Sequence, residues 1–413
     1  MGLIAPRRTS RDIRSDSRLD VLHAVLSAGE TTRNEIAQAT GLSAATVVTI
    51  VGELIDEGII IETKVTVGRV GRPTATLGMN PHRGRVVGID VAETYVRAVM
   101  FDTSLNRIGY VEGSRDEHVL DPDSIVEGIG SALDRLLEQE GVVRDDVLGV
   151  GLSLPGLVQG PTGVVAVVVP NWEWRSVELD HLRDRIDLPL VIDNPLKAMV
   201  AAELWLGRGR SASSMVTVNL GTGVGAGIVL EGKVLRGATN SAGEWGHSLL
   251  MLDGRLCRCG RRGCVEAYVG VPGIHQTLRE LAPTHPLAEV ELQADFITSL
   301  ARAAAGPDPD SAARDTVERT AYYLGSALAD LVAVVNPGVV TLTGWTTWAL
   351  GDQLVPAVRE RLSTEAPGGA GSTVDLEIST VGGNSVATGM AMMALERFLV
   401  DAGLLTTRLP VAL

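Results

Sequence analysis

The strongest constraint on the fold of this chain is the grouping of its cysteines. All three, Cys257, Cys259 and Cys264, lie within eight residues of one another in a segment rich in glycine and arginine. Thiols this close together favour a metal-binding loop over a disulfide. An exposed redox cluster is the alternative. Three thiolates on a tight loop supply three corners of the tetrahedron that a structural zinc ion (Zn2+) requires. His247, ten residues before Cys257, is the natural fourth ligand.

Charge is divided unevenly along the chain. Residues 1–85 hold 11 basic and 9 acidic side chains, whereas the rest of the 413 residues hold 25 basic and 41 acidic ones. A mildly basic first segment on an acidic body is typical of a protein whose first segment alone touches nucleic acid. The sequence has no run of about 18 apolar residues, and its arginine-rich start lacks the apolar core of a signal peptide. We therefore expect a cytoplasmic protein with no membrane partner.

The first segment, residues 1–80, predicts a winged helix-turn-helix DNA-binding domain. Thr32-Arg33-Asn34-Glu35 is a capping-box pattern that begins a helix, and Ser43 can cap a second helix from Ala44 to Glu57. Two short helices joined by a glycine-containing turn form the motif whose second helix enters the major groove. The β-prone runs Ile59–Val65 and Thr74–Leu77 then bracket a glycine-rich tip, which predicts a wing.

DNA contacts are expected from the second helix and from the wing. Small residues at the start of the helix allow close approach to base edges, and arginines at the wing tip can reach phosphates or a narrow minor groove. The residues expected to contact DNA are Ser43, Ala44, Ala45, Thr46, Thr49, Arg69 and Arg72. The residues expected to form the buried face of the second helix are Val47, Val48, Ile50, Val51, Leu54 and Ile55. The alternative is a helical hairpin that serves as a dimer arm.

The remaining residues, 81–413, alternate strand-like and helix-like segments. The runs that predict strands are Val86–Asp90, Tyr95–Phe101, Val147–Leu154, Ser214–Leu220 and Ile228–Leu230. The stretches that predict helices are Ile125–Glu138, Ala198–Leu206, Thr316–Val335 and Ser385–Leu399. This alternation predicts an α/β fold with helices on both faces of the sheet.

From Leu220 to Glu266 the sequence resembles the signature of the ROK family (repressors, open reading frames, kinases). The resemblance is carried by the glycine-rich run after Leu220, by Gly243-Glu244-Trp245-Gly246-His247, and by the cysteine segment that ends in Val265-Glu266. Together with the winged head, the chain resembles the xylose- and N-acetylglucosamine-repressor branch of that family.

The resemblance implies an actin-like two-lobed ATPase fold for the body, of the kind found in sugar kinases. Lobe one is expected at about residues 84–197 together with the C-terminal helix at 385–400. Lobe two is expected at about residues 198–384 and includes the zinc loop at 247–266. A homodimer or a tetramer is also implied.

The resemblance further implies a sugar pocket. The residues that correspond to those holding sugar hydroxyls in the family are Asn171, Asn194, Glu244, His247 and Glu266. Carboxylates and amides suit this role because they form paired hydrogen bonds with neighbouring hydroxyls. A histidine fixed to a metal through one ring nitrogen can present the other to a ligand.

Three departures from the kinase pattern of the family predict that this chain is not an enzyme. Pro195 stands where the kinases carry the aspartate that deprotonates the sugar hydroxyl, and a proline cannot accept a proton. The loop that reads Asp-x-Gly-Gly-Thr in the kinases reads Asp90-Val91-Ala92-Glu93-Thr94 here, and Trp345 replaces a glycine on the adenosine side. Phosphoryl transfer depends almost wholly on positioning and electrostatics, so three such losses weigh against it.

We therefore expect a kinase-inactive, sugar-responsive transcriptional regulator of carbohydrate or amino-sugar metabolism genes. A repressor is the first interpretation, with an activator as the alternative. Paired heads would bind an inverted-repeat operator, in a bacterial cytoplasm and on the nucleoid. One alternative is an active ATP-dependent sugar kinase with an added DNA-binding head. The other is a constitutive DNA-binding scaffold whose body binds no ligand.

The effector is expected to be a sugar or a sugar 6-phosphate. Loss of the acid at position 195 removes a charge that would repel a phosphate, and Lys197 follows two residues later. The residues expected to contact the phosphate are Lys197, Gly221, Thr222 and Gly223, the last three through backbone N–H groups. The alternative is that position 195 drifted once catalysis was lost, with Lys197 pointing to solvent.

Overall fold

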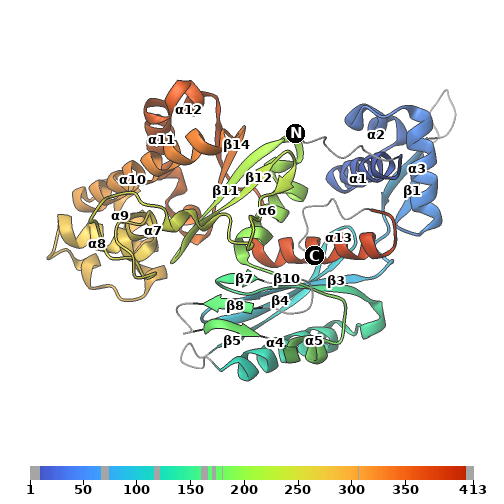
Figure 1. The fold of residues 1–413 in the computed structure, drawn as a ribbon, viewed down its shortest axis with the longest axis horizontal. Helices are drawn as coiled ribbons and strands as arrows, with labels where there is room; N and C mark the ends of the chain where they lie inside the picture. Colours follow the sequence, from blue (N-terminus) through green and yellow to red (C-terminus); the bar gives the residue numbers. More distant parts are fainter. Residues whose placement is uncertain are drawn as a thin grey trace, which may run out of the picture. The chain divides into compact units, whose positions relative to one another are not determined.

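The computed structural model describes residues 10–66, 74–115, 121–159, 166–169, 174–178, 180–305 and 307–405. The chain divides into two compact units, one of residues 1–206 with 384–413 and one of residues 207–383. Figure 1 follows the chain through both. The boundary expected near residue 197 would divide helix α6 (Pro195–Leu206), which belongs wholly to the first unit.

The winged helix-turn-helix forms where the sequence predicts it. Its elements are α1 (Ser10–Ala28), α2 (Arg33–Thr40), α3 (Ala44–Asp56), β1 (Ile60–Thr66) and β2 (Thr74–Met79), and the two strands pair antiparallel. Thr32 and Glu35 form the capping box of α2, and Gly41 ends that helix with a φ of 69°. Ser43 caps α3 by accepting the Thr46 backbone N–H at 3.1 Å.

One predicted core residue of α3 is wrong. Val47, Ile50, Val51 and Leu54 are buried and Ile55 is half-buried, but the side chain of Val48 is 55% exposed. A helix turns about 100° per residue, so the four buried positions span an arc of about 100°, and position 48 lies about 60° beyond its edge. The helix therefore carries a branched apolar side chain on its outer face.

The rest of the first unit is built on a five-stranded sheet in the order β10-β6-β3-β4-β5. Strands β10, β6 and β3 are parallel, whereas β4 and β5 follow antiparallel. The strands are β3 (Arg85–Val91), β4 (Tyr95–Asp102), β5 (Arg107–Ser114), β6 (Val147–Ser153) and β10 (Leu190–Asp193). A small antiparallel sheet is formed by β7 (Leu157–Gln159), β8 (Ala166–Val169) and β9 (Trp174–Glu178).

Helices cover both faces of this sheet, as the alternation predicts. The covering helices are α4 (Pro122–Glu140), α5 (Asp180–Ile186), α6 and α13 (Ser385–Asp401). Figure 1 shows α4 and α13 on opposite faces. A Cβ on Gly88 or Gly151 would overlap the carbonyl groups of Ala387 and Met390, so these glycines let α13 lie directly on β3 and β6. The C-terminal helix is thus part of the first sheet's core.

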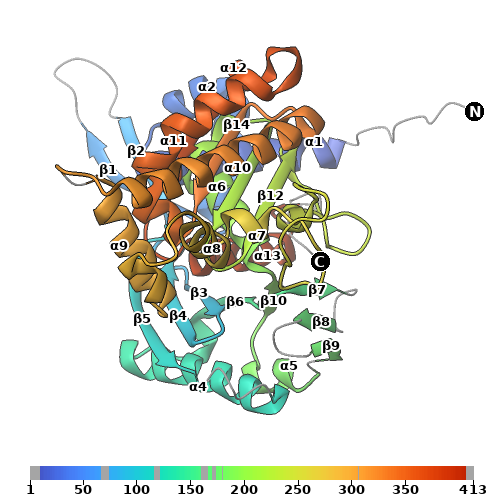
Figure 2. The ribbon, with the colours of Figure 1, turned by 90° about the vertical axis from the view of Figure 1, so that its left-hand side faces the viewer.

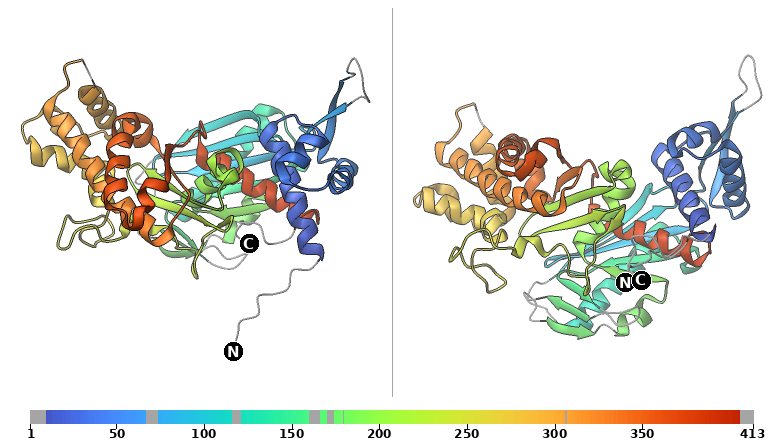
Figure 3. Two further views of the ribbon diagram at one scale, coloured as in Figure 1. Left: turned by 90° about the horizontal axis from the view of Figure 1, so that it is seen from above. Right: turned by 45° about the horizontal axis from the view of Figure 1, so that its top comes forward.

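Within the first unit, α1 of the DNA-binding head packs against the body. The His23 ring lies on the Trp205 ring of α6 with a centroid distance of 3.9 Å. The Trp205 indole N–H donates to a Glu396 carboxylate oxygen of α13 at 2.5 Å, and both side chains are 2% or less exposed. Arg18 donates to the Leu404 carbonyl oxygen at 3.4 Å, so α1 lies beside the segment that follows α13 (Figure 3).

The second unit repeats the topology of the first sheet. Its order β13-β12-β11-β14-β15 combines two antiparallel pairs and two parallel pairs. The strands are β11 (Ser214–Leu220), β12 (Val224–Leu230), β13 (Lys233–Val234), β14 (Val339–Thr343) and β15 (Asp375–Ile378). In both sheets, the first strand in sequence is central, with its antiparallel partners on one side. This repetition is the expected two-lobed architecture.

Helices α10 and α11 lie side by side in the second unit, as Figure 2 shows. The helices of this unit are α7 (Glu266–Val269), α8 (Val271–Leu281), α9 (Gln293–Ala305), α10 (Ser311–Val335), α11 (Trp345–Glu365) and α12 (Ala370–Thr373). The part of the chain that the structure describes also has short 3₁₀ turns at Arg144–Asp146, Arg208–Ser211, Glu244–His247, Pro286–Glu289 and Pro367–Gly369.

The glycine-rich run after Leu220 differs from the sequence prediction. The sequence predicts a strand only from Ile228, but β12 begins at Val224, directly opposite Leu220 in the β11–β12 pair. The glycines at 225 and 227 lie inside the sheet, where paired backbone replaces the expected open loop. Only Gly221–Gly223 forms a turn, closed by the Gly221 N–H donating to the Gly223 carbonyl oxygen at 3.2 Å.

Among the described residues, no single helix is long and apolar enough to cross a membrane. Helices α2 and α3, which are bent by 117° relative to each other, reach the length and apolar composition of a membrane span only when they are counted together.

Candidate functional site

The four predicted zinc ligands come together in the second unit. The ligand atoms of His247, Cys257, Cys259 and Cys264 all lie within 4.8 Å of one another. The Cys259 and Cys264 sulfurs are 3.7 Å apart, and the Cys257 sulfur lies 3.6 Å from His247 Nδ1. A tetrahedral zinc with Zn–S bonds of about 2.3 Å places sulfurs about 3.8 Å apart. The donor set and its spacing therefore fit a zinc ion.

Tight turns give the cluster its shape. The Gly260 N–H donates to the Cys257 carbonyl oxygen at 2.9 Å, and the Cys257 N–H donates to the Arg261 carbonyl oxygen at 2.8 Å. Gly260 has a φ of 84°, a conformation that side chains disfavour. Burial raises the pKa of the Cys257 and Cys264 thiols. A metal bound here would displace those thiol protons.

Glu266 joins the cysteine loop to the glycine turn. One carboxylate oxygen accepts the Val224 N–H at 3.0 Å, and the other accepts the Cys257 thiol at 3.5 Å. The carboxylate is 6% exposed and lies 3.6 Å from the Arg258 guanidinium. Glu266 thus connects the two segments that carry the family resemblance.

The predicted sugar and phosphate residues of the second unit lie in one region. Glu244 and His247 belong to the same 3₁₀ turn, and Gly246 between them packs so closely on Val224 that a Cβ there would overlap the Val224 carbonyl. Val224 follows the turn Gly221–Gly223 directly and also contacts Glu266. The structure therefore brings Glu244, His247 and Glu266 together with the glycine turn.

Arg258 is a residue of this region whose role the sequence analysis did not single out. Its guanidinium lies 3.3 Å from the position that a Cβ on Gly223 would occupy, besides its contact with Glu266. Its place inside the cysteine segment could have marked it, but the sequence alone does not tell whether an arginine there faces solvent or the glycine turn.

The predicted residues of the first unit are buried at the start of α6. Asn194 is 2% exposed, and its side-chain oxygen accepts the Lys197 N–H at 3.0 Å, which caps the helix. The side chain of Lys197 is 1% exposed. The alternative that Lys197 points to solvent is therefore wrong. Asp193, also buried, accepts the Asn194 N–H at 2.9 Å.

Three predicted contact residues, Asn171, Arg69 and Arg72, lie outside the described residues. The other DNA-contact residues surround the start of α3, where Ser43, Ala44, Ala45 and Thr49 are exposed and Thr46 is half-buried. The Thr49 hydroxyl donates to the Ala45 carbonyl oxygen at 3.0 Å. Val48 also lies on this outer face. The sequence does not predict this, because Val48 stands in an apolar run that indicates a buried residue.

Two features of the structure bear on the departures from the kinase pattern. Asp90 is buried and accepts hydrogen bonds from the Tyr95 hydroxyl at 3.0 Å and the Asn384 amide at 2.9 Å, while burial raises its pKa. In the second unit, the Trp345 indole nitrogen lies 2.9 Å from the position of a Cβ on Gly221. The first carboxylate is thus engaged by neighbouring side chains, and an indole ring lies against the glycine turn.

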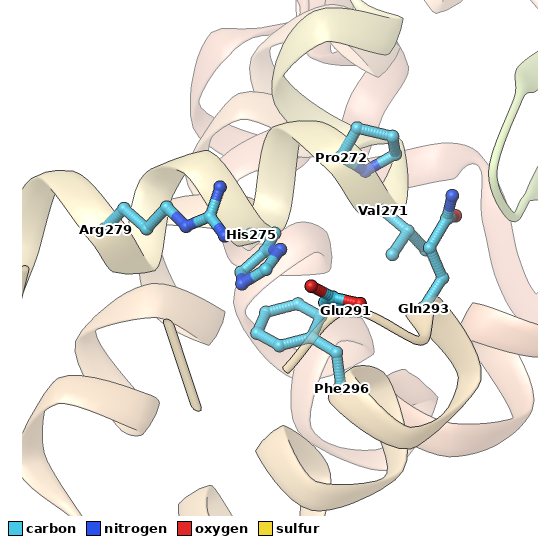
Figure 4. Close-up of a pocket in the computed structure, with 7 residues that line it drawn as sticks. All are labelled: Val271, Pro272, His275, Arg279, Glu291, Gln293 and Phe296. Carbon is cyan, nitrogen blue, oxygen red and sulfur yellow. The ribbon is translucent and has the colours of Figure 1, made fainter. Parts of the chain in front are cut away.

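A pocket of about 300 Å³ lies beside the same turn, between α8 and the start of α9 (Figure 4). Gln293 accepts a hydrogen bond from the Thr222 hydroxyl at 2.8 Å, which ties the pocket to the turn. The His275 ring packs on Phe296 at 4.3 Å, and burial lowers its pKa. The lining residues are Val271, Pro272, His275, Arg279, Glu291, Gln293 and Phe296. They come from separate elements and form no sequence motif.

Comparison with known proteins agrees with this architecture. The model of the ROK family matches residues 86–397, and a model described as winged helix-turn-helix DNA-binding matches residues 14–61. The chain is a two-lobed α/β protein with an N-terminal winged helix-turn-helix, and it belongs to the ROK family.

Its relatives include both enzymes and repressors. A glucokinase from Halalkalibacterium halodurans is 30% identical over 73% of this chain and 92% of its own. The xylose repressor of Bacillus subtilis is 24% identical over 92% of this chain and 94% of its own. The crystal structure of a ROK family transcriptional regulator, a homologue of the E. coli MLC protein, matches with a TM-score of 0.74 at 22% identity, over 96% and 99% of the two chains.

Proposed function

We propose that this chain is a DNA-binding repressor of carbohydrate or amino-sugar metabolism genes, whose affinity for its operator changes when a sugar binds to the ROK body. The observation that carries the proposal is the joining of a winged helix-turn-helix to a ROK body in one chain. The match to a xylose repressor over 92% of this chain supports it. A sugar can shift operator binding only if it binds two states of the protein with different affinity.

In this proposal the body has lost kinase activity. Pro195 begins α6 directly after Asn194, where a family kinase carries its catalytic acid. The Asp90 carboxylate is engaged by Tyr95 and Asn384, and Trp345 lies against Gly221. These three features support a body that binds sugar without transferring phosphate.

The second candidate function is an active sugar kinase with an added DNA-binding head. The 30% identity to a glucokinase favours it. A coupled assay with ATP and a panel of hexoses and amino sugars separates the two candidates. We expect turnover at background for every sugar, and robust turnover on any of them would replace the first proposal by the second.

A structural zinc ion is part of the proposal, bound by His247, Cys257, Cys259 and Cys264. The ion would hold the loop that precedes Glu266, and Glu266 in turn contacts the glycine turn through Val224. Closed sites with four protein ligands stabilise a fold and leave no open position for catalysis. The zinc would therefore shape the sugar site.

The sugar would be held by Asn171, Asn194, Glu244, His247 and Glu266, as the family resemblance implies. A 6-phosphorylated sugar is the sharper form of the proposal, with its phosphate at Gly221, Thr222, Gly223 and Lys197. The Arg258 guanidinium beside Gly223 supports an anion at the turn. The Lys197 side chain is 1% exposed. Its ammonium group would therefore be reached only by a ligand group that is itself buried in the protein.

DNA would be bound by two heads of a symmetric oligomer, a homodimer or a tetramer, on an inverted-repeat operator. A two-fold assembly mirrors a two-fold symmetric site, and half-site spacing follows the helical repeat of DNA. Such a protein would act in the cytoplasm, where it meets the nucleoid. Sedimentation of the full chain, alone and with operator, gives the number of subunits.

The decisive experiment combines operator selection with ligand screening. The full chain selects duplexes from a random pool, and binding is then measured by fluorescence anisotropy with and without D-xylose, D-glucose, N-acetylglucosamine and their phosphates. We expect a palindromic operator and at least one sugar that changes its affinity about fivefold or more, within the usual range of coupling between sites. The same sugar should raise the melting temperature.

Two outcomes contradict the proposal. Selection that enriches no sequence would exclude a specific DNA-binding function. An operator whose affinity none of the sugars changes, with no melting-temperature shift, would leave a constitutive DNA-binding scaffold. Tighter binding of the unphosphorylated sugar in every matched pair would remove the phosphate from the proposal and leave the rest standing.

A further inference from the structure

The outer face of α3 is apolar. Its exposed residues in the first turns are Ala44, Ala45, Val48 and Thr49, and Val48 is 55% exposed. Its opposite face is buried against the other helices of the head through Val47, Ile50, Val51 and Leu54. The face that the winged helix-turn-helix turns to DNA therefore carries one large side chain, and that side chain is a branched hydrocarbon.

This face lacks the side chains that read bases by paired hydrogen bonds. From Ala44 to Gly52 the helix has no arginine, lysine, asparagine, glutamine or acidic residue. The first charged residue, Glu53, forms an ion pair with Arg18 at 2.5 Å. Guanine and adenine are recognised in the major groove by bidentate arginine, lysine, asparagine or glutamine. Residues 44–52 cannot make such contacts.

The hydroxyl groups near Val48 are already used within the helix. The Thr49 hydroxyl donates to the Ala45 carbonyl oxygen at 3.0 Å, and the Thr46 and Ser43 hydroxyls lie 2.8 Å apart, so that one of them donates to the other. Their remaining capacity is mainly to accept. The dominant contact that this face can offer a base edge is therefore van der Waals contact from Val48.

We propose that Val48 reads the C5-methyl group of a thymine in each operator half-site. Thymine is the one base of unmodified DNA that presents a methyl group in the major groove, and apolar side chains recognise it there. The operator would have an A·T pair beneath Val48, while affinity would come mainly from phosphate contacts made elsewhere on the head. This inference rests on the proposed DNA-binding function and names the base that its second helix selects.

The test removes the methyl group from the DNA and the side chain from the protein, separately and together. In the selected operator, each thymine is replaced in turn by deoxyuridine, which lacks only the methyl group. Affinities of the full chain are measured by fluorescence anisotropy for wild type, Val48→Ala and Val143→Ala. Val143 is the matched control, because it is 62% exposed and belongs to the body, outside the head.

We expect one thymine per half-site at which deoxyuridine weakens wild-type binding about three- to tenfold. The Val143→Ala protein should show the same loss, whereas Val48→Ala should bind the thymine and deoxyuridine operators within about 1.5-fold of each other. A tenfold effect corresponds to about 1.4 kcal/mol. Because Val48 is exposed, its replacement by alanine should leave the melting temperature unchanged.

Two results would overturn the inference. In one, no deoxyuridine substitution weakens binding of the wild-type protein to an operator that it does select. In the other, a sensitive thymine exists, but Val48→Ala remains as sensitive to its methyl group as wild type. Either result would leave the proposed DNA-binding function intact. Failure to select any operator would instead remove that function and this inference with it.

Discussion

The substitution Gly389→Ala tests the close packing of α13 on α6. A Cβ on Gly389 would overlap the Ala198 carbonyl group and lie 3.0 Å from the Ala198 Cα. These are backbone atoms of a helix, so they cannot turn aside as the end of a side chain can. Overpacking costs about 1–3 kcal/mol, and a rigid obstacle places the cost at the upper end. Alanine gains about 1 kcal/mol in a helix, which leaves a net loss of about 2 kcal/mol.

Gly128→Ala is the matched control. Gly128 lies inside α4, is exposed, and has nothing within 4 Å of its Cβ position. Its replacement should raise the free energy of unfolding by about 1 kcal/mol through helix propensity alone. Gly389→Ala should lower the free energy of unfolding and Gly128→Ala should raise it, so the two variants should differ by about 3 kcal/mol.

Urea denaturation followed by circular dichroism and tryptophan fluorescence measures the difference. The midpoints should move while the slopes stay the same, since the surface exposed on unfolding is unchanged. If Gly389→Ala were as stable as Gly128→Ala, α13 would not lie against α6 as described. The argument from backbone contact would then fail.

Further substitutions test three separate parts of the molecule. Cys259→Ser should reduce the bound zinc from about one ion per chain, and elemental analysis that finds no stoichiometric zinc in the wild type would exclude the site. Arg72→Ala should weaken operator binding and reduce the slope of log affinity against log salt concentration by about one. Thr49→Ala should instead change the preference among operator variants. Identical effects of the two substitutions would contradict a phosphate contact for Arg72 and a base contact for Thr49. Trp205→Phe removes the indole N–H that donates to Glu396, so thermal melts should show a loss of about 2 kcal/mol in the free energy of unfolding. Adding Glu396→Gln should recover part of that loss. An unchanged stability of Trp205→Phe would exclude a stabilising role for this hydrogen bond.

Much of the local structure could be predicted from the sequence because it depends on neighbouring residues. The capping box of Thr32 and Glu35 and the cap of Ser43 act over three residues, and both form as predicted. The grouping of His247 with the three cysteines follows from a short loop with glycine turns, and these four ligand atoms do lie together.

The parts that could not be predicted depend on contacts between distant segments. Val48 and Val47 are both apolar, and only the packing of the three helices decides which of them is buried. Lys197 would be placed at a surface by its charge, yet its helix lies in the core of the first unit. Trp205 and Glu396 are 191 positions apart, and nothing in the sequence near either residue indicates the other. In the glycine-rich run, strand pairing with β11 prevails over the flexibility that glycine suggests.

Because α13 belongs to the first unit, that unit cannot finish folding until residues 385–401 have been synthesised. Domains commonly fold as they emerge, the N-terminal one first. Here β3 and β6 emerge early, but the helix that covers one of their faces is made only at residues 385–401. The second unit is continuous from residue 207 to 383 and is therefore finished before the first. A nascent chain that ends before residue 385 also lacks Glu396 beneath Trp205, so the support of the DNA-binding head against α6 is complete only in a full-length molecule.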